Sequence, residues 1–320
     1  MIEFQSVWGW QPALYLFLGG AGAGAFIAAA VLFLIDPKKN KKTALVTSIA
    51  SIVCLAIGLA LLLTELTSPL RGFLLWQSFS NFGSLMAIGA WLLMATMVVI
   101  AADAVLMSGK ISKIGEDAAV KACRVLSVIG ILCSAGVAVY TGVLLMMADG
   151  IPFWGTALLP CLFTVSALDT GLALAMIIFQ ATRKDEQAHG TLRIMEAVVL
   201  GLVAVEAIVV FAFVTTMLAG GGATTVGTGT SAIAAATSAQ LLTGGELSGW
   251  FWILFVGIGL VVPFVAALAS ILLGKHAGAK WASLTGAACA LAGGCALRFL
   301  VLSAGTHADY LTDAVSRLLY

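Results

Sequence analysis

Six ionisable side chains stand inside or at the edges of long apolar runs, where a charge is costly and usually functional. They are Glu65, Asp103, Asp169, Glu196, Glu206 and Arg298. Asp169 and Glu206 stand near the middle of their runs, where a carboxylate costs about 2.5–3.5 kcal/mol if the run spans a bilayer. A partner, water or a bound proton must offset that cost. Asp169 and Glu206 are therefore candidates for a proton path, with purely structural pairing as the alternative.

The other charged residues have more ordinary explanations beside the functional one. Asp103 and Glu196 lie near the ends of their runs, and we favour the interpretation that both reach interfacial water, although each could also extend a proton path. Arg298 could pair with Glu65 if the helices that carry them touch. Structural pairing remains an alternative for every one of these residues.

A second group of residues has the chemistry of a quinone site. The chain reads Tyr140-Thr-Gly-Val-Leu-Leu, then Pro152-Phe-Trp, then Pro160-Cys-Leu-Phe. A quinone site needs an apolar cleft, donors for two carbonyl oxygens and a proton route. Tyr140 can donate, and Glu65 and Asp169 could carry protons. The alternative for Tyr140 and Trp154 is a place in the aromatic belt at the membrane interface.

Residue types also exclude several functions. The three histidines, His189, His276 and His307, lie outside the apolar runs, so axial ligands for an intramembrane haem are missing. The six cysteines form no C-x-x-C pair, and we expect neither an iron–sulfur cluster nor a metal in this chain. The glycines from Gly19 to Gly24 lack nucleotide-binding spacing. Gly20 and Gly24 instead form a small-xxx-small pair, which favours close helix packing.

The apolar runs predict an all-α integral membrane protein with about eight transmembrane helices. Of the 320 residues, 61% are hydrophobic and 10% charged, against about 25% charged in soluble domains. Each run is long enough to cross about 30 Å of hydrocarbon, and a spanning backbone must bond internally, so helices are expected. The expected spans are 12–35, 43–64, 83–107, 123–148, 156–180, 194–218, 250–273 and 280–304.

Basic residues predict the orientation. Thirteen of the sixteen stand at alternate connections, and the others are Arg71, Arg298 and Arg317. By the positive-inside rule the thirteen face the cytoplasm, which places both termini on the extracytoplasmic side of the cytoplasmic (inner) membrane.

Two four-helix bundles are expected within one membrane domain, covering residues 1–148 and 149–320. A loosely similar Pro-containing start of the first and fifth spans would fit two parallel halves. The outer connection 219–249 is rich in Gly, Thr and Ser, which is typical of a flexible loop. Within it, residues 231–242 could form a short helix on the membrane surface or on a partner, with a disordered loop as the alternative.

The chain resembles the NrfD/PsrC-type membrane subunits of polysulfide reductase and related respiratory complexes. The resemblance rests on Tyr15-Leu-Phe-Leu-Gly-Gly in the first span, Tyr140-Thr-Gly-Val-Leu-Leu in the fourth, and Pro152-Phe-Trp to Ser166-Ala-Leu-Asp-Thr-Gly171 before and within the fifth. It implies two four-helix bundles, no haem, and a quinone site near the outer face, for menaquinone or ubiquinone.

The resemblance also implies partners and roles. A four-cluster ferredoxin-like iron–sulfur subunit would dock on the outer face, with a molybdopterin catalytic subunit or a multihaem cytochrome beyond it. Nucleic acid is not an expected partner. Tyr140 would contact the quinone, with Glu65 as the acid near the site and Asp169 as the intramembrane acid. The His or Asn that the family can use in the first span is missing here. Trp76, Gln77 or Asn81 could substitute.

The expected function is a quinone-reactive membrane anchor in a respiratory electron-transport chain, with oxidoreductase activity only together with its partner subunits. Proton translocation through Asp169, Glu206, Arg298, Glu196 and Asp103 is a further hypothesis. One alternative is a secondary transporter with Asp169 and Glu206 as coupling-ion ligands, although no paired mid-depth helix breaks are evident. The other is a purely structural anchor.

Overall fold

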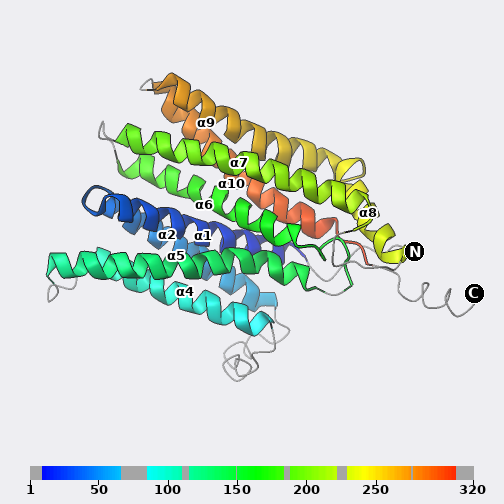
Figure 1. Cartoon of the computed structure of the whole chain (residues 1–320), viewed down its shortest axis with the longest axis horizontal. Coiled ribbons are helices and arrows are strands. Elements are labelled where there is room, and N and C mark those ends of the chain that lie inside the picture. The colour runs from blue at the N-terminus through cyan, green and yellow to red at the C-terminus, as the bar shows by residue number, and fades with distance from the viewer. Residues whose placement is uncertain are drawn as a thin grey trace, which may run out of the picture.

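The computed structural model describes residues 9–65, 85–109, 115–148, 150–183, 188–221, 229–274 and 277–307. Within these ranges, eight helices are long and apolar enough to cross a membrane, which confirms the expected all-α membrane fold (Figure 1). The spans are α1 (Trp10–Ile35), α2 (Pro37–Glu65), α4 (Leu85–Met107), α5 (Glu116–Met146), α6 (Leu158–Thr182), α7 (Ala188–Leu218), η2 (Trp250–Val261) continuing into α9 (Val262–Leu273), and α10 (Ala277–Ser303).

Two spans begin earlier than their apolar runs. α2 starts at Pro37, so the lysines that follow Asp36 lie in its first turns and not in a loop. Asp36 precedes the helix and accepts a hydrogen bond from the backbone N–H of Lys39 at 3.1 Å, as an N-cap residue does. Proline suits the first helical position because that position needs no N–H donor. α5 starts at Glu116. Apolar runs mark the membrane-embedded part of a helix, and capping sets where the helix begins.

α1 and α6 cross at the centre of the molecule with their backbones in contact. A Cβ placed on Gly24 would lie 2.0 Å from the Ala167 carbonyl oxygen, and one placed on Gly171 would lie 2.2 Å from the Gly24 carbonyl carbon. The expected close packing at Gly20 and Gly24 is therefore present. Besides each other, α1 contacts α2, α5 and α10, while α6 contacts α2, α5, α7 and α10.

We call the end of the molecule where α1 passes into α2 the basic end (left in Figure 1). Polar contacts there join α2 to α6. Arg183 donates to the Asn40 side-chain oxygen at 2.7 Å, and the Thr43 and Thr182 hydroxyls lie 2.7 Å apart. Asn40 in turn donates to the Leu32 carbonyl of α1 at 2.8 Å.

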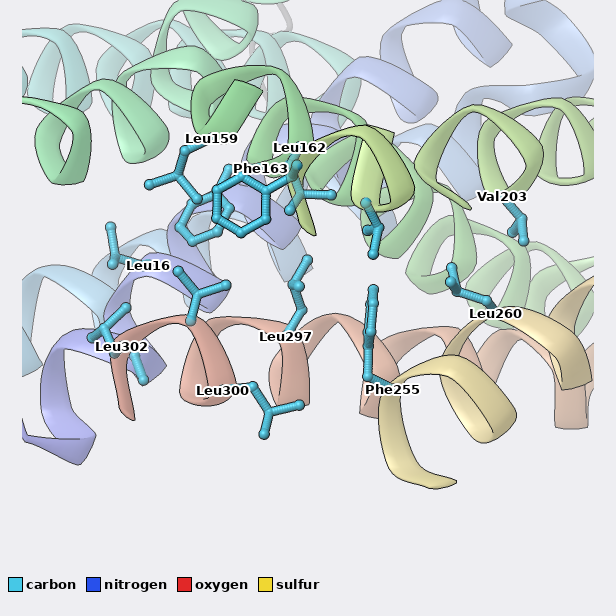
Figure 2. Close-up of a cluster of buried hydrophobic side chains, with 14 of the residues drawn as sticks. Leu16, Leu159, Leu162, Phe163, Val203, Phe255, Leu260, Leu297, Leu300 and Leu302 are labelled. Carbon is cyan, nitrogen blue, oxygen red and sulfur yellow. The ribbon is translucent and has the colours of Figure 1, made fainter. Parts of the chain in front are cut away.

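The largest apolar cluster joins α1, α6, α7, η2 and α10. Figure 2 shows Phe163 of α6 and Phe255 of η2 on either side of Leu297 of α10, and Val203 of α7 close to Leu260 of η2. This core therefore spans the two predicted halves. The division into domains 1–148 and 149–320 stays a prediction.

The opposite end carries the expected short helix. α8 (Gly229–Thr243) includes the predicted segment 231–242. The Ser238 hydroxyl of α8 lies 2.8 Å from that of Thr306, which also donates to the Ala234 carbonyl at 3.1 Å. The helix thus packs on the segment that follows α10. α1 begins and α10 ends at this same end (Figure 1), but the side of the membrane that it faces stays a prediction.

Trp154 is fully buried, so its placement in a lipid-facing aromatic belt is wrong. Its indole N–H donates to the Val301 carbonyl at 3.0 Å. Val301 lies in the last turn of α10, where carbonyls lack partners within the helix. The tryptophan therefore caps α10.

The seventh span changes geometry halfway. Residues Trp250–Val261 are π-helical, and the α-helical part begins at Val262 with Pro263 in its first turn. Proline interrupts an α-helical hydrogen-bond ladder, and a change of helix type accommodates it. Gly259 of this segment touches the backbone of Gly293 in α10, since a Cβ on Gly259 would lie 2.6 Å from the Gly293 Cα.

Candidate functional site

Arg298 lies fully buried in α10 and reaches across to α6. Its Nη1 donates to the Ser166 hydroxyl at 2.6 Å and to the Gly294 carbonyl at 2.8 Å, and its Nη2 donates to the Phe163 carbonyl at 3.2 Å. The guanidinium carbon lies 5.1 Å from the centre of the Phe163 ring, in the range of a cation–π contact. Gly20 of α1 leaves room for it, since a Cβ there would lie 3.3 Å from Nη2.

The two mid-membrane carboxylates lie next to this arginine. Glu206 of α7 is buried near the Ser166 hydroxyl and within electrostatic range of Arg298. Asp169 of α6 is buried one helical turn from Ser166 and near Glu206. Its Oδ1 has no hydrogen-bond partner in the described part of the chain. The structure thus brings Asp169, Glu206 and Arg298 together, with Ser166 between the cation and Glu206.

The pairing of Arg298 with Glu65 stays a prediction, because the side chain of Glu65 lies outside the described residues. All three described hydrogen bonds of Arg298 go to α6 and α10. The side chain of Glu65, the last residue of α2, lies outside the described residues, as do Trp76, Gln77 and Asn81. Their roles at a quinone site therefore stay predictions.

Glu196 of α7 is buried, so the favoured interpretation that it reaches interfacial water is wrong. The Ser270 hydroxyl of α9 donates to its Oε1 at 2.5 Å, and Ser283 of α10 lies nearby. Gln180 of α6 donates to the Ser283 hydroxyl at 2.9 Å. Hydroxyl partners from neighbouring helices replace water around this carboxyl.

A small cavity adjoins Glu196 on its membrane-centre side. Its volume of about 10 Å³ is room for about one water molecule. Its lining includes Glu196 and Val199 of α7, Ala173 of α6, and Pro263 of α9. Ala173 lies one helical turn from Asp169, so the cavity stands between the levels of Glu196 and Asp169.

Asp103 of α4 is also fully buried, and the expectation of interfacial water is wrong for it as well. Its neighbours are the Cys123 thiol and the Ser127 hydroxyl of α5. Neither carboxyl oxygen makes a hydrogen bond of normal geometry with any described residue. Asp103 belongs to the first four spans and lies apart from Asp169 and Glu206.

Tyr140 of α5 is half-buried against α4. A Cβ placed on Gly89 would overlap its ring, so glycine makes the space that the tyrosine occupies. No hydrogen bond joins its hydroxyl to another residue of the described ranges. Among those residues, no group of three or more His, Cys, Asp or Glu side chains gathers as a metal site would require.

Sequence reasoning missed the residues that hold Arg298. Ser166 stands 132 positions away and is a common residue in membrane helices, so only its place in the fold reveals its role. The Phe163 contribution comes partly from its backbone carbonyl, which no side-chain pattern can indicate.

Comparison with known proteins agrees with this architecture. The profile of the family described as "Polysulphide reductase, NrfD" matches residues 3–308. The C subunit of polysulfide reductase from Wolinella succinogenes is 31% identical over 323 residues, covering 93% of this protein and 94% of that subunit. Protein NrfD of Escherichia coli is 29% identical over 329 residues, covering 95% of this protein and 96% of that one. The protein therefore belongs to the NrfD/polysulphide reductase family of membrane subunits of oxidoreductase complexes.

Proposed function

We propose that this chain is the quinone-reactive membrane subunit of a respiratory oxidoreductase complex. It would exchange electrons between the quinone pool, menaquinone or ubiquinone, and an extracytoplasmic iron–sulfur subunit. The observation that carries the proposal is the family match along nearly the whole chain, together with a half-buried tyrosine, packed on Gly89, at the position that the family resemblance assigns to the quinone.

Tyr140 fits a quinone ligand by its chemistry. A phenol that is half-buried and has no described partner can donate a hydrogen bond to a carbonyl oxygen at little desolvation cost. A bound quinone would supply two-electron, two-proton redox chemistry. The chain's own part is to hold the ring and to move protons, and Glu65 at the end of α2 is the proposed acid nearby.

The proton path is proposed to run along α7. Glu196, Val199, Val203 and Glu206 share the buried face of this helix, and the two carboxylates are ten residues, or about 15 Å, apart. The cavity between them can hold one water, which shortens the gap that a proton must cross. Asp169 beside Glu206 is the proposed relay at mid-membrane, and Arg298 holds the pair in place through Ser166.

The proposed assembly follows from the family. The partners are a four-cluster ferredoxin-like subunit on the extracytoplasmic face and a molybdopterin subunit or multihaem cytochrome beyond it. The proposed location is the inner membrane with both termini outside, so that the basic end faces the cytoplasm.

Substitution of Tyr140 tests the quinone role. We expect Tyr140→Phe to leave the complex assembled and to lower quinol turnover at least tenfold, because the donor is lost while the ring that packs on Gly89 stays. Unchanged turnover would remove Tyr140 from the site. Phe211→Tyr, at a lipid-exposed position of α7, is the matched control and should change neither assembly nor turnover.

Vesicles reconstituted with the whole complex test the proton path. Turnover should be coupled to a pH change across the membrane, and Asp169→Asn should abolish that change. If the wild-type complex turns over quinol with no transmembrane pH change, the path is wrong although the quinone role stands.

A further inference from the structure

A polar layer crosses three of the first four spans near the basic end. Three residues from α2, α4 and α5 pack in one apolar cluster; they are Ala44, Met107 and Cys123. One helical turn further from that end, each helix carries a polar residue: Ser48 on α2, Asp103 on α4 and Ser127 on α5. All three are fully buried. Each polar residue stands four positions, about one helical turn, from the residue of its own helix that packs in the apolar cluster. The three polar residues therefore lie at one level.

A second apolar layer closes the other side. Ile52, Ile100 and Ile131, again three or four residues further along each helix, pack around one cluster with Phe26 of α1 and Val137 of α5. The polar layer is therefore enclosed between two apolar layers. A buried polar group in such a place requires a partner.

Within the described residues, the layer lacks those partners. Ser48 Oγ, Ser127 Oγ and both carboxyl oxygens of Asp103 are all buried without a hydrogen bond of normal geometry. The Cys123 thiol lies beside the carboxyl, and Lys41 of α2, the cation within electrostatic range of that thiol, is exposed at the helix surface. α1 faces this region with Ala29 and Phe33, which carry no charge.

The second half of the chain contains a comparable arrangement. There Glu196 of α7 is met by Ser270 of α9 and lies near Ser283 of α10. Both sets draw one carboxyl and two hydroxyls from the second, third and fourth spans of their half, near the basic end. In the second half the Ser270 hydroxyl donates to the carboxyl, whereas no described residue of the first half makes a hydrogen bond of normal geometry with Asp103.

We propose that Asp103 is a proton-binding site in the first four spans, formed with Ser48 and Ser127. One proton binds one carboxylate oxygen, the group becomes a neutral carboxylic acid, and its O–H donates to a neighbouring hydroxyl. A bound proton removes the uncompensated charge and supplies a donor to a layer in which no described residue is a cation. The site exchanges its proton with the basic end, because the layer on that side is the shorter barrier. The inference does not depend on quinone binding at Tyr140.

Labelling with a hydrophobic carbodiimide tests the site, because this reagent modifies carboxylic acids that are protonated within a membrane. The full-length, quinone-free protein is labelled in lipid vesicles at several pH values, and each peptide is quantified by mass spectrometry. We expect Asp103 to be labelled at neutral pH and its labelling to fall at least tenfold at alkaline pH. Asp117, exposed on α5, is the internal control and should stay unlabelled at neutral pH.

Infrared difference spectroscopy provides the second measurement, which needs no reagent access. The spectrum of the wild-type protein minus that of the Asp103→Asn variant should show one carbonyl band of a protonated carboxylic acid per chain. That band should shift in deuterium oxide. That band without labelling would still support the site. Absence of the band at neutral pH would overturn the proposal. In the labelling experiment, protection of Asp103 by sodium but not by potassium would also overturn it, because that result would indicate a sodium site instead.

Discussion

Substitution of Gly24 by alanine tests whether the α1–α6 crossing holds the molecule together. The added Cβ would lie 2.0 Å from the Ala167 carbonyl oxygen and 2.9 Å from its carbon, whereas ordinary contact begins at 3.4 Å. The helices must therefore separate by about 1.4 Å, the difference between the contact distance and 2.0 Å. The obstructing atoms are backbone, so no side chain can rotate away.

The magnitude follows from two opposing effects. Overpacking costs about 1–3 kcal/mol, and we take the upper end because backbone must move. Alanine recovers about 1 kcal/mol of helix propensity. The net loss in free energy of unfolding is about 2 kcal/mol, which is a roughly 30-fold change in the unfolding equilibrium constant.

The assay is unfolding in mixed micelles with increasing sodium dodecyl sulfate, followed by tryptophan fluorescence. Gly201→Ala is the matched control: it lies mid-helix in α7, is exposed, and has no atom within 4 Å of its added Cβ. It should be as stable as the wild type or slightly more so. If Gly24→Ala unfolds at the same detergent fraction as Gly201→Ala, the backbone contact does not stabilise the fold and the reasoning fails.

Three further substitutions test single contacts. Arg298→Lys should lower the free energy of unfolding by about 2–3 kcal/mol, because one ammonium cannot serve the acceptors that the planar guanidinium joins on α6; a loss under roughly 0.5 kcal/mol in the same unfolding assay would contradict this. Trp154→Phe should cost about 1–2 kcal/mol and lower Tm, since the Val301 carbonyl at the end of α10 loses its donor; an unchanged Tm would mean that this cap is not needed. The pKa of Asp36 lies below its ordinary 3.8 because the Lys39 backbone N–H donates to the charged carboxylate. The stability that this contact contributes is therefore fully present above the ordinary pKa and is lost as the pH falls through the lowered pKa. Asp36→Ala should therefore lower Tm at neutral pH, with the difference from wild type shrinking below about pH 4, and a difference that is independent of pH would contradict the role of the charge.

The spans were predictable because a lipid-embedded backbone must bond to itself, so apolar runs leave no choice but helices. The same argument indicates nothing about helix type. Every residue from Trp250 to Val261 is apolar or glycine and suits an α-helix, so the π-helical geometry became visible only in three dimensions.

The charged residues were found by sequence, but their environments were not. Position near the end of a run suggested water for Asp103 and Glu196, yet neighbouring helices cover both. Depth along a single helix determines distance from the interface, whereas burial depends on which other helices pack there. Arg298 was recognised because a charged residue stands out in an apolar run. Its partner Ser166 was missed because a serine hydroxyl in a membrane helix usually donates to a backbone carbonyl of its own helix.

The crossing of α1 and α6 also restricts how the chain can move. In a rocking transporter, two rigid bodies tilt about a central site and open alternately at each end. Here the Gly24–Gly171 contact could act as a pivot, but the Arg183–Asn40 and Thr43–Thr182 hydrogen bonds fasten the basic end. Opening the basic end would break both hydrogen bonds at once. The crossing of α1 and α6 and the polar contacts between α2 and α6 thus hold the first and second halves of the chain together at two levels.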